Sequence, residues 1–165
     1  MMLKIALFVI IAAMVGQCQP KSLAYEHDSC SAHHQDRSPK YRVVRKVPWK
    51  SIGILYVLVV IKPQDASKAN LISVGCSVGQ RFAQWDTVEA EIFDSEDDAR
   101  RYSIAAGITG QEGPGEGLAG LKAIYQMAQT GKAAGQGLLY RDDPTSPYMT
   151  VSIELGPPPK PKRSK

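Results

Sequence analysis

Residues Ile52 to Ile61 read I-G-I-L-Y-V-L-V-V-I, and this stretch decides the fold. It is rich in β-branched and aliphatic residues, and both alternating sets of positions are apolar. A continuous apolar run of this length is typical of a strand that is buried on both faces of a sheet. It is too short to cross a membrane as a helix, which takes about 20 residues. We therefore expect a buried strand near 52–61.

The residues that follow predict a helix and a second strand. Asp65 or Ser67 can cap the start of a helix over 67–83, and its apolar residues recur at helical spacing. The stretch 87–93 reads T-V-E-A-E-I-F and alternates apolar with polar residues. One face of this strand would carry Val88, Ala90 and Ile92, and the other Glu89, Glu91 and Phe93. Strand, helix and strand together predict a βαβ unit with a right-handed crossover.

The remaining pattern predicts two more helices and a hairpin. A helix near 95–105 has acidic residues in its first turn and arginines near its end, as the helix dipole favours. A glycine-rich loop follows over 107–117. A helix near 118–129 would bury a stripe of Leu121, Ile124, Tyr125 and Ala128. Turn residues inside 138–155 predict a C-terminal hairpin, preceded by a loop over 131–137. The sequence thus predicts an α+β fold over 51–155, a single domain with one small mixed sheet.

The amino-terminal residues have the layout of a secretory signal peptide. A positively charged start ending at Lys4 precedes an apolar run over 5–16, and polar residues then return. The run is shorter than the roughly 20 residues of a membrane-spanning helix. We therefore expect an exported protein, periplasmic or extracellular, with no transmembrane segment after cleavage.

Two cleavage sites fit this signal segment. One follows Ala24 and gives a signal peptide of residues 1–24, and the other follows Cys18. Lipid attachment at Cys18 would require a small residue just before it, and Gln17 stands there instead. A lipid anchor is therefore not expected.

The chain has polar segments on both sides of the predicted domain. Residues 25–50 contain all the histidines and no apolar period, so we expect a flexible arm, with 41–49 able to pair as an edge strand. Residues 156–165 form a proline-rich basic tail. The net charge of +4 is accounted for by this tail and the signal segment. A neutral domain argues against a nucleic-acid partner, and the tail could contact an anionic envelope surface.

Cleavage at either site leaves Cys30 and Cys76 as a pair of cysteines. An even number of cysteines in an oxidising compartment favours a disulfide. That bond would close a long loop and stabilise the fold by about 3–4 kcal/mol. The alternative is two independent thiols, one of them in the flexible arm.

The arm also holds candidate metal ligands in His27, His33 and His34. Imidazole is a common ligand of copper and zinc. Cleavage after Ala24 would place His27 third in the chain, where the terminal amine, two backbone amides and the imidazole can surround Cu(II). The alternative is a polar segment that binds no metal.

No residue pattern for nucleophilic catalysis is present. There is no G-x-S-x-G, and histidines in a flexible arm are not preorganised bases. The G-x-G-x-x-G of residues 115–120 lacks the preceding strand that a dinucleotide loop needs, so we interpret it as a connector. Glu89, Glu91 and Asp94 remain as a candidate carboxylate set for hydrolysis.

These observations leave three hypotheses for function. The first is a small exported, non-enzymatic protein that binds a partner, either a protein or an anionic envelope surface. The second is a metal-handling protein that uses the histidine arm. The third is a small hydrolase that uses carboxylates, which predicts a pocket near 89–94 and a carboxyl group whose pKa is shifted by burial.

Overall fold

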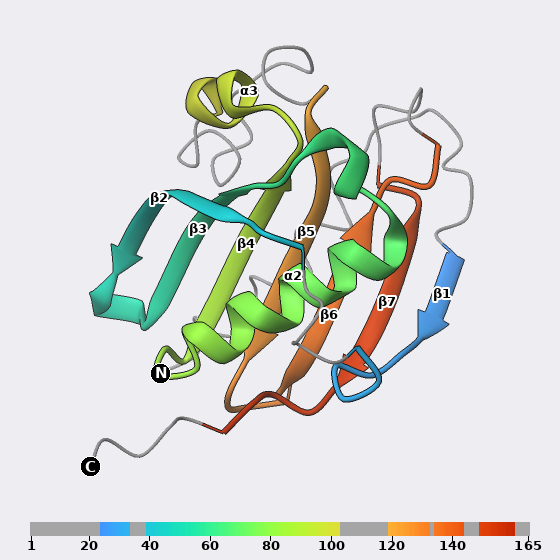
Figure 1. Cartoon of the computed structure of the whole chain (residues 1–165). Coiled ribbons are helices and arrows are strands. Elements are labelled where there is room, and N and C mark those ends of the chain that lie inside the picture. Colours follow the sequence, from blue (N-terminus) through green and yellow to red (C-terminus); the bar gives the residue numbers. More distant parts are fainter. Residues whose placement is uncertain (1–23, 34–38, 103–118, 133, 144–148, 161–165) are drawn as a thin grey trace, which may run out of the picture.

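A computed structural model describes residues 24–33, 39–102, 119–132, 134–143 and 149–160. Its framework is one mixed seven-stranded sheet in the order β1-β7-β6-β5-β4-β3-β2. The helix α2 lies across one face of this sheet, and the short helix α3 lies at one end of it (Figure 1). The α+β prediction is confirmed.

The sequence positions of the strands and helices show a βαβ unit followed by an antiparallel meander. In chain order the elements are β1 (Ala24–His27), β2 (Arg42–Trp49), β3 (Ile54–Val60), α2 (Lys68–Arg81), β4 (Thr87–Phe93), α3 (Glu96–Arg101), β5 (Leu121–Ala128), β6 (Gly135–Tyr140) and β7 (Val151–Gly156). Short 3₁₀ turns, η2 (Lys50–Ile52) and η3 (Pro63–Asp65), flank β3.

The central βαβ unit matches the prediction. Strands β3 and β4 are parallel neighbours, with Leu55 beside Val88 and Val59 beside Ile92. Ser67 caps α2, since its side chain accepts a hydrogen bond from the backbone N–H of Asn70 at 3.4 Å. Strand β3 is buried over residues 55–59, as the continuous apolar run requires.

The main core fills the space between α2 and the sheet. It combines the inward residues of α2 with one alternating set from β3 to β7, including Val57, Val78, Ile92, Tyr125 and Ile153. Val88, Ala90 and Ile92 all belong to this core, so the predicted facing of β4 is confirmed.

A smaller apolar cluster lies on the sheet face opposite α2. Tyr56 and Leu58 of β3 and Phe93 of β4 pack there with Ala99 of α3. The rings of Phe93 and Tyr102 are 5.3 Å apart. Because α3 is short, this second layer covers one end of the face, whereas α2 lies across strands β4 to β6 on the other face (Figure 1).

The predicted helix near 118–129 is wrong, because Leu121–Ala128 is the strand β5. The stretch L-K-A-I-Y-Q-M-A fits both a helix and a strand. Its apolar residues can form the stripe of a helix, and most of them also alternate with polar residues as in a strand. Tertiary pairing decides between them, since β5 lies antiparallel to β4 on one side and to β6 on the other.

The structure also differs from the prediction in the segments on either side of β5. Gly135 and Gly137 belong to β6 rather than to a 131–137 loop, because they pair with Ala128 and Gln126 of β5. The C-terminal hairpin is confirmed, since β6 and β7 are antiparallel neighbours. Helix α3 spans Glu96–Arg101, and the 107–117 loop lies outside the described residues.

Residues 25–50, expected to form a flexible arm, contribute to both edges of the sheet. Strand β1 pairs in parallel with β7, and β2 pairs antiparallel with β3, as the edge-strand option over 41–49 allowed. Backbone pairing holds these segments although their sequences carry little apolar pattern. The described start of the basic tail is also attached, because Gln129 Nε2 donates to the carbonyl of Pro159 at 3.0 Å.

Among the described helices, none is both long and apolar enough to cross a membrane.

Candidate functional site

Four polar side chains lie together on the sheet face opposite α2. Glu89 and Glu91 alternate with the core residues of β4, so both point away from α2. Across the sheet, Glu89 is flanked by Tyr56 of β3 and Gln126 of β5. We call these residues, Tyr56, Glu89, Glu91 and Gln126, the Glu91 cluster.

Glu91 is the most unusual member of the cluster. Its side chain is only 3% exposed, and it lies between Leu58 of β3 and Ile124 of β5. Its Oε2 is buried and has no hydrogen-bond partner. Burial, and then the neighbouring charge of Glu89, raise the pKa of the Glu91 carboxyl well above its ordinary value. A neutral carboxylic acid is therefore favoured at this position.

Glu89 differs from Glu91 because it is half-buried and has a partner. Gln126 Nε2 donates a hydrogen bond to its Oε2 at 2.9 Å. Burial raises the pKa of Glu89, while the bond from Gln126 acts in the opposite direction. Glu89 is thus the more exposed of the two carboxyl groups.

Aromatic side chains flank the two carboxyl groups. Burial, followed by the charges of Glu89 and Glu91, raises the pKa of Tyr56 to about 12. The ring of Trp49 meets that of Tyr56 edge-to-face, with centroids 5.4 Å apart. The cluster therefore combines acidic groups with an aromatic wall.

Asp94, the third candidate carboxylate, is placed differently. It follows the end of β4, and its Oδ2 lies 2.9 Å from Lys122 Nζ. The Asp94 carboxylate is therefore already paired with a basic side chain. The structure brings Glu89 and Glu91 together and leaves Asp94 outside their cluster.

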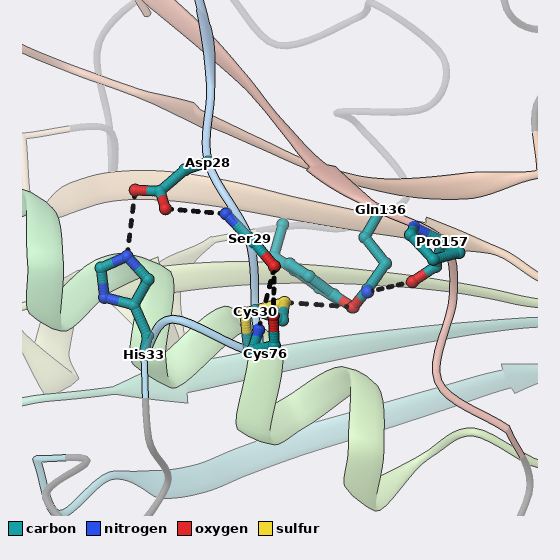
Figure 2. The surroundings of a disulfide bond; sticks show 9 residues. Asp28, Ser29, Cys30, His33, Cys76, Gln136 and Pro157 are labelled. Atoms are coloured by element: carbon teal, nitrogen blue, oxygen red, sulfur yellow. Dashed lines mark hydrogen bonds and ion pairs between the residues drawn. A yellow bond between two sulfur atoms is a disulfide. The ribbon is translucent and has the colours of Figure 1, made fainter.

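The second notable region is the disulfide between Cys30 and Cys76, whose Cα atoms are 5.5 Å apart. It joins the turn after β1 to the middle of α2 (Figure 2). A second link between these elements is the ion pair of Lys68 with Glu26. The amino-terminal edge of the sheet is thus covalently attached to the helix layer.

A buried polar network lies beside the disulfide. Tyr125 donates its hydroxyl hydrogen to Gln136 Oε1 at 2.6 Å, and Gln136 Nε2 donates to the carbonyl of Pro157 at 2.5 Å. Cys30 Sγ lies 3.4 Å from the same Gln136 oxygen (Figure 2). This network satisfies the amide of Gln136, so it is a structural feature rather than an open site.

The candidate metal ligands are held by separate acidic partners. His27 Nδ1 lies 3.1 Å from Glu154 Oε2, and His33 Nε2 lies 3.0 Å from Asp28 Oδ2 (Figure 2 shows the second pair). His34 lies outside the described residues. Within the described ranges, no group of three or more His, Cys, Asp or Glu side chains is placed to hold a metal ion.

The proposed amino-terminal copper geometry conflicts with the position of β1. It would use the backbone amides of Glu26 and His27, which belong to a strand paired with β7. The residues at the ends of this pairing, Ala24 and Asp28, donate backbone hydrogen bonds to Thr150 and Glu154. Copper would therefore have to displace β1 from the sheet edge.

Sequence reasoning identified Glu89 and Glu91 but not the residues beside them. The sequence pattern places Tyr56 in a continuous apolar run and Gln126 in a predicted helix, which does not form. Both lie next to Glu89 only through strand register. A strand interpretation of 121–128 would have placed Gln126 on the same face as Lys122 and Ile124, which is the signal that was available.

Comparison of the chain with protein-family models, with curated proteins and with solved structures gave no match.

Proposed function

We propose that this chain is a small exported, non-enzymatic binding protein that takes its partner on the sheet face opposite α2, at the Glu91 cluster. The observation that carries the proposal is the buried, unpartnered Oε2 of Glu91. A group that cannot satisfy its hydrogen bonds within the fold is suited to a partner that supplies them.

An apolar residue at the position of Glu91 would avoid a free-energy cost that the buried carboxyl group carries. A buried polar atom without a hydrogen bond costs about 1–3 kcal/mol. Leu58 and Ile124 on either side show that the site would accept an apolar side chain. Residues that break a packing rule without local compensation are typical of functional positions.

Export is supported by the amino-terminal signal pattern and by the disulfide. Disulfides persist in oxidising compartments and are rare in the cytosol. The Cys30–Cys76 bond therefore agrees with an exported protein.

The test is an NMR screen of the full exported protein, oxidised and ¹⁵N-labelled. Small fragments bearing amines, carboxylates, hydroxyls or aromatic rings would be added singly. The proposal expects shifts at residues 54–58, 89–91 and 124–126, whichever class of fragment binds. Binding confined to the α2 side or to the β1 edge, or no binding at all, would reject this face as the site.

A carboxylate-dependent hydrolase at the same residues is a second candidate. It is favoured by two neighbouring carboxyl groups whose pKa values burial raises. Chromogenic esters and glycosides incubated with the protein and with Glu89→Gln would separate the two. Turnover that the substitution abolishes would favour hydrolysis, and fragment binding without turnover would favour a binding protein.

A further inference from the structure

We infer that the Glu91 cluster binds a basic side chain, an arginine or a lysine, presented by a polypeptide partner. This inference rests on the proposed function and names the chemistry of its ligand. It is carried by the geometry of the cluster and by the charges around it.

Glu91 is the only buried acidic residue among those that the structure describes, and neither it nor Glu89 forms an ion pair there. Five other described acidic residues, all at least partly exposed, form ion pairs, namely Glu26 with Lys68, Asp28 with His33, Asp94 with Lys122, Glu96 with Arg42 and Arg100, and Glu154 with His27. Among the described residues, Glu89 receives its side-chain hydrogen bond from a neutral amide, and Glu91 Oε2 receives none. A cation from outside would supply the missing charge.

The arrangement of the cluster suits a long basic side chain. Glu89 is half-buried, whereas Glu91 is buried two residues further along the same strand. A guanidinium or ammonium group that displaces the hydrogen bond from Gln126 can donate to Glu89 and also to the free Oε2 of Glu91. Arginine is the better candidate, because its planar group donates several hydrogen bonds in fixed directions.

The neighbouring aromatic residues favour the same ligand. Trp49 is half-buried and packs edge-to-face against Tyr56, which is the neighbour of Glu89 on β3. Aromatic faces attract cations, most strongly when water is excluded. A cation held by Glu89 would therefore lie close to an aromatic wall.

A polypeptide rather than a small amine is indicated by the surrounding surface. Partly buried apolar side chains on the same sheet face pack against Tyr56 and its apolar neighbours, among them Val47, Trp49, Ile54 and Ile124. These residues can contact the main chain and the apolar neighbours of a basic residue. A small diamine would leave them uncovered.

Binding of a cation should release a proton. A positive charge next to Glu91 favours its carboxylate, so the proton held by the neutral carboxyl passes to the buffer. No covalent bond forms or breaks. The affinity for a basic peptide should therefore increase as the pH rises from 5 to 8.

The experiment is isothermal titration of the full oxidised protein with acetyl-Leu-Arg-Leu-amide. Titrations in phosphate and in Tris give the number of protons released, and acetyl-Leu-Gln-Leu-amide is the uncharged control. We expect Glu91→Gln to reduce proton release, leaving only the part that comes from Glu89, whose pKa burial also raises, and Glu89→Gln to weaken binding about tenfold or more. Glu154→Gln is the matched control, an exposed glutamate on the same sheet face, and should bind as the unmodified protein does.

The outcomes separate this inference from the proposed function. Equal binding of the arginine and glutamine peptides, or proton release in Glu91→Gln equal to that of the unmodified protein, would overturn the cationic ligand while leaving the face a binding site. Putrescine binding as tightly as the arginine peptide would overturn the polypeptide partner. If neither the peptides nor the fragments bind at this face, both the inference and the proposed function fail.

Discussion

Tyr125 of β5 lies in the space that Gly75 of α2 leaves open. A Cβ atom added at Gly75 would come within 2.7 Å of Tyr125 Cδ2 and 3.1 Å of Cγ. One turn further along the helix, a Cβ at Gly79 would collide with the hydroxyl group of the same ring. The two glycines therefore let the helix approach the sheet closely enough to bury a tyrosine beneath it.

Substitution Gly75→Ala should destabilise the protein although alanine favours helices. The helix would gain about 1 kcal/mol of propensity, but the new methyl group overlaps the base of a buried ring, and overpacking costs about 1–3 kcal/mol. We expect a net loss of up to about 2 kcal/mol in the free energy of unfolding, measured in urea. The pair Ser73→Ala and Ser73→Gly, at a half-buried site of α2, gives the propensity difference alone. If Gly75→Ala raised the free energy of unfolding by as much as the difference between the two Ser73 variants, the Tyr125 ring would not be tightly packed against the helix.

Removal of the disulfide should loosen the amino-terminal edge of the sheet. The bond closes a loop with a sequence separation of 46 residues, so its loss should cost about 2–4 kcal/mol. We expect faster hydrogen exchange at Tyr25–His27 in Cys30→Ala,Cys76→Ala than in the oxidised protein, because among the described strands β1 pairs with β7 alone. Dithiothreitol should have the same effect on the unmodified chain and none on the variant. Unchanged exchange in β1 would mean that backbone pairing alone holds it.

The buried carboxyl of Glu91 should make stability depend on pH. Its pKa is raised in the folded state from an ordinary 4.5, so the folded protein holds a proton that the unfolded chain releases. The stabilisation is complete below pH 4.5 and is lost as the pH rises through the folded-state value. We therefore expect the urea concentration at the unfolding midpoint to decrease as the pH is raised from 4.5 to about 8.

The variant Glu91→Gln should remove most of that pH dependence and be the more stable protein at pH 8. A neutral amide of similar shape has no charge to desolvate. The exposed Glu154→Gln should leave the slope unchanged. Parallel pH profiles for Glu91→Gln and the unmodified chain would show that Glu91 is already ionised in the folded state.

Loss of the Tyr125 hydroxyl should destabilise the core more than its size suggests. In Tyr125→Phe, the buried Gln136 Oε1 loses its 2.6 Å donor, and an unsatisfied buried acceptor costs about 1–3 kcal/mol. Thermal unfolding followed by circular dichroism measures the change. Tyr25→Phe is the control, because Tyr25 is 78% exposed and should have no effect. An equal response of the two variants would mean that water replaces the lost donor.

The sequence predicted the centre of the fold because the relevant signals there are local and agree with one another. The run over 54–60 is apolar on both faces, Ser67 supplies a cap, and Val88, Ala90 and Ile92 alternate strictly. It failed over 121–128, where the same residues fit a helix or a strand. Nothing within that segment distinguishes the two, because the deciding partners are β4 and β6.

For the candidate site, too, some features follow from the sequence and others only from the tertiary structure. The sequence alone determined that Glu89 and Glu91 share one face of a strand, that the run over 52–61 contains a buried strand, and that Cys30 and Cys76 could pair. Only the tertiary structure decided that Glu91 lies between Leu58 and Ile124, with Tyr56 and Gln126 beside Glu89. The physical reason is that alternation along a strand is fixed by backbone geometry, whereas burial and pKa depend on the strands and helices that pack around it.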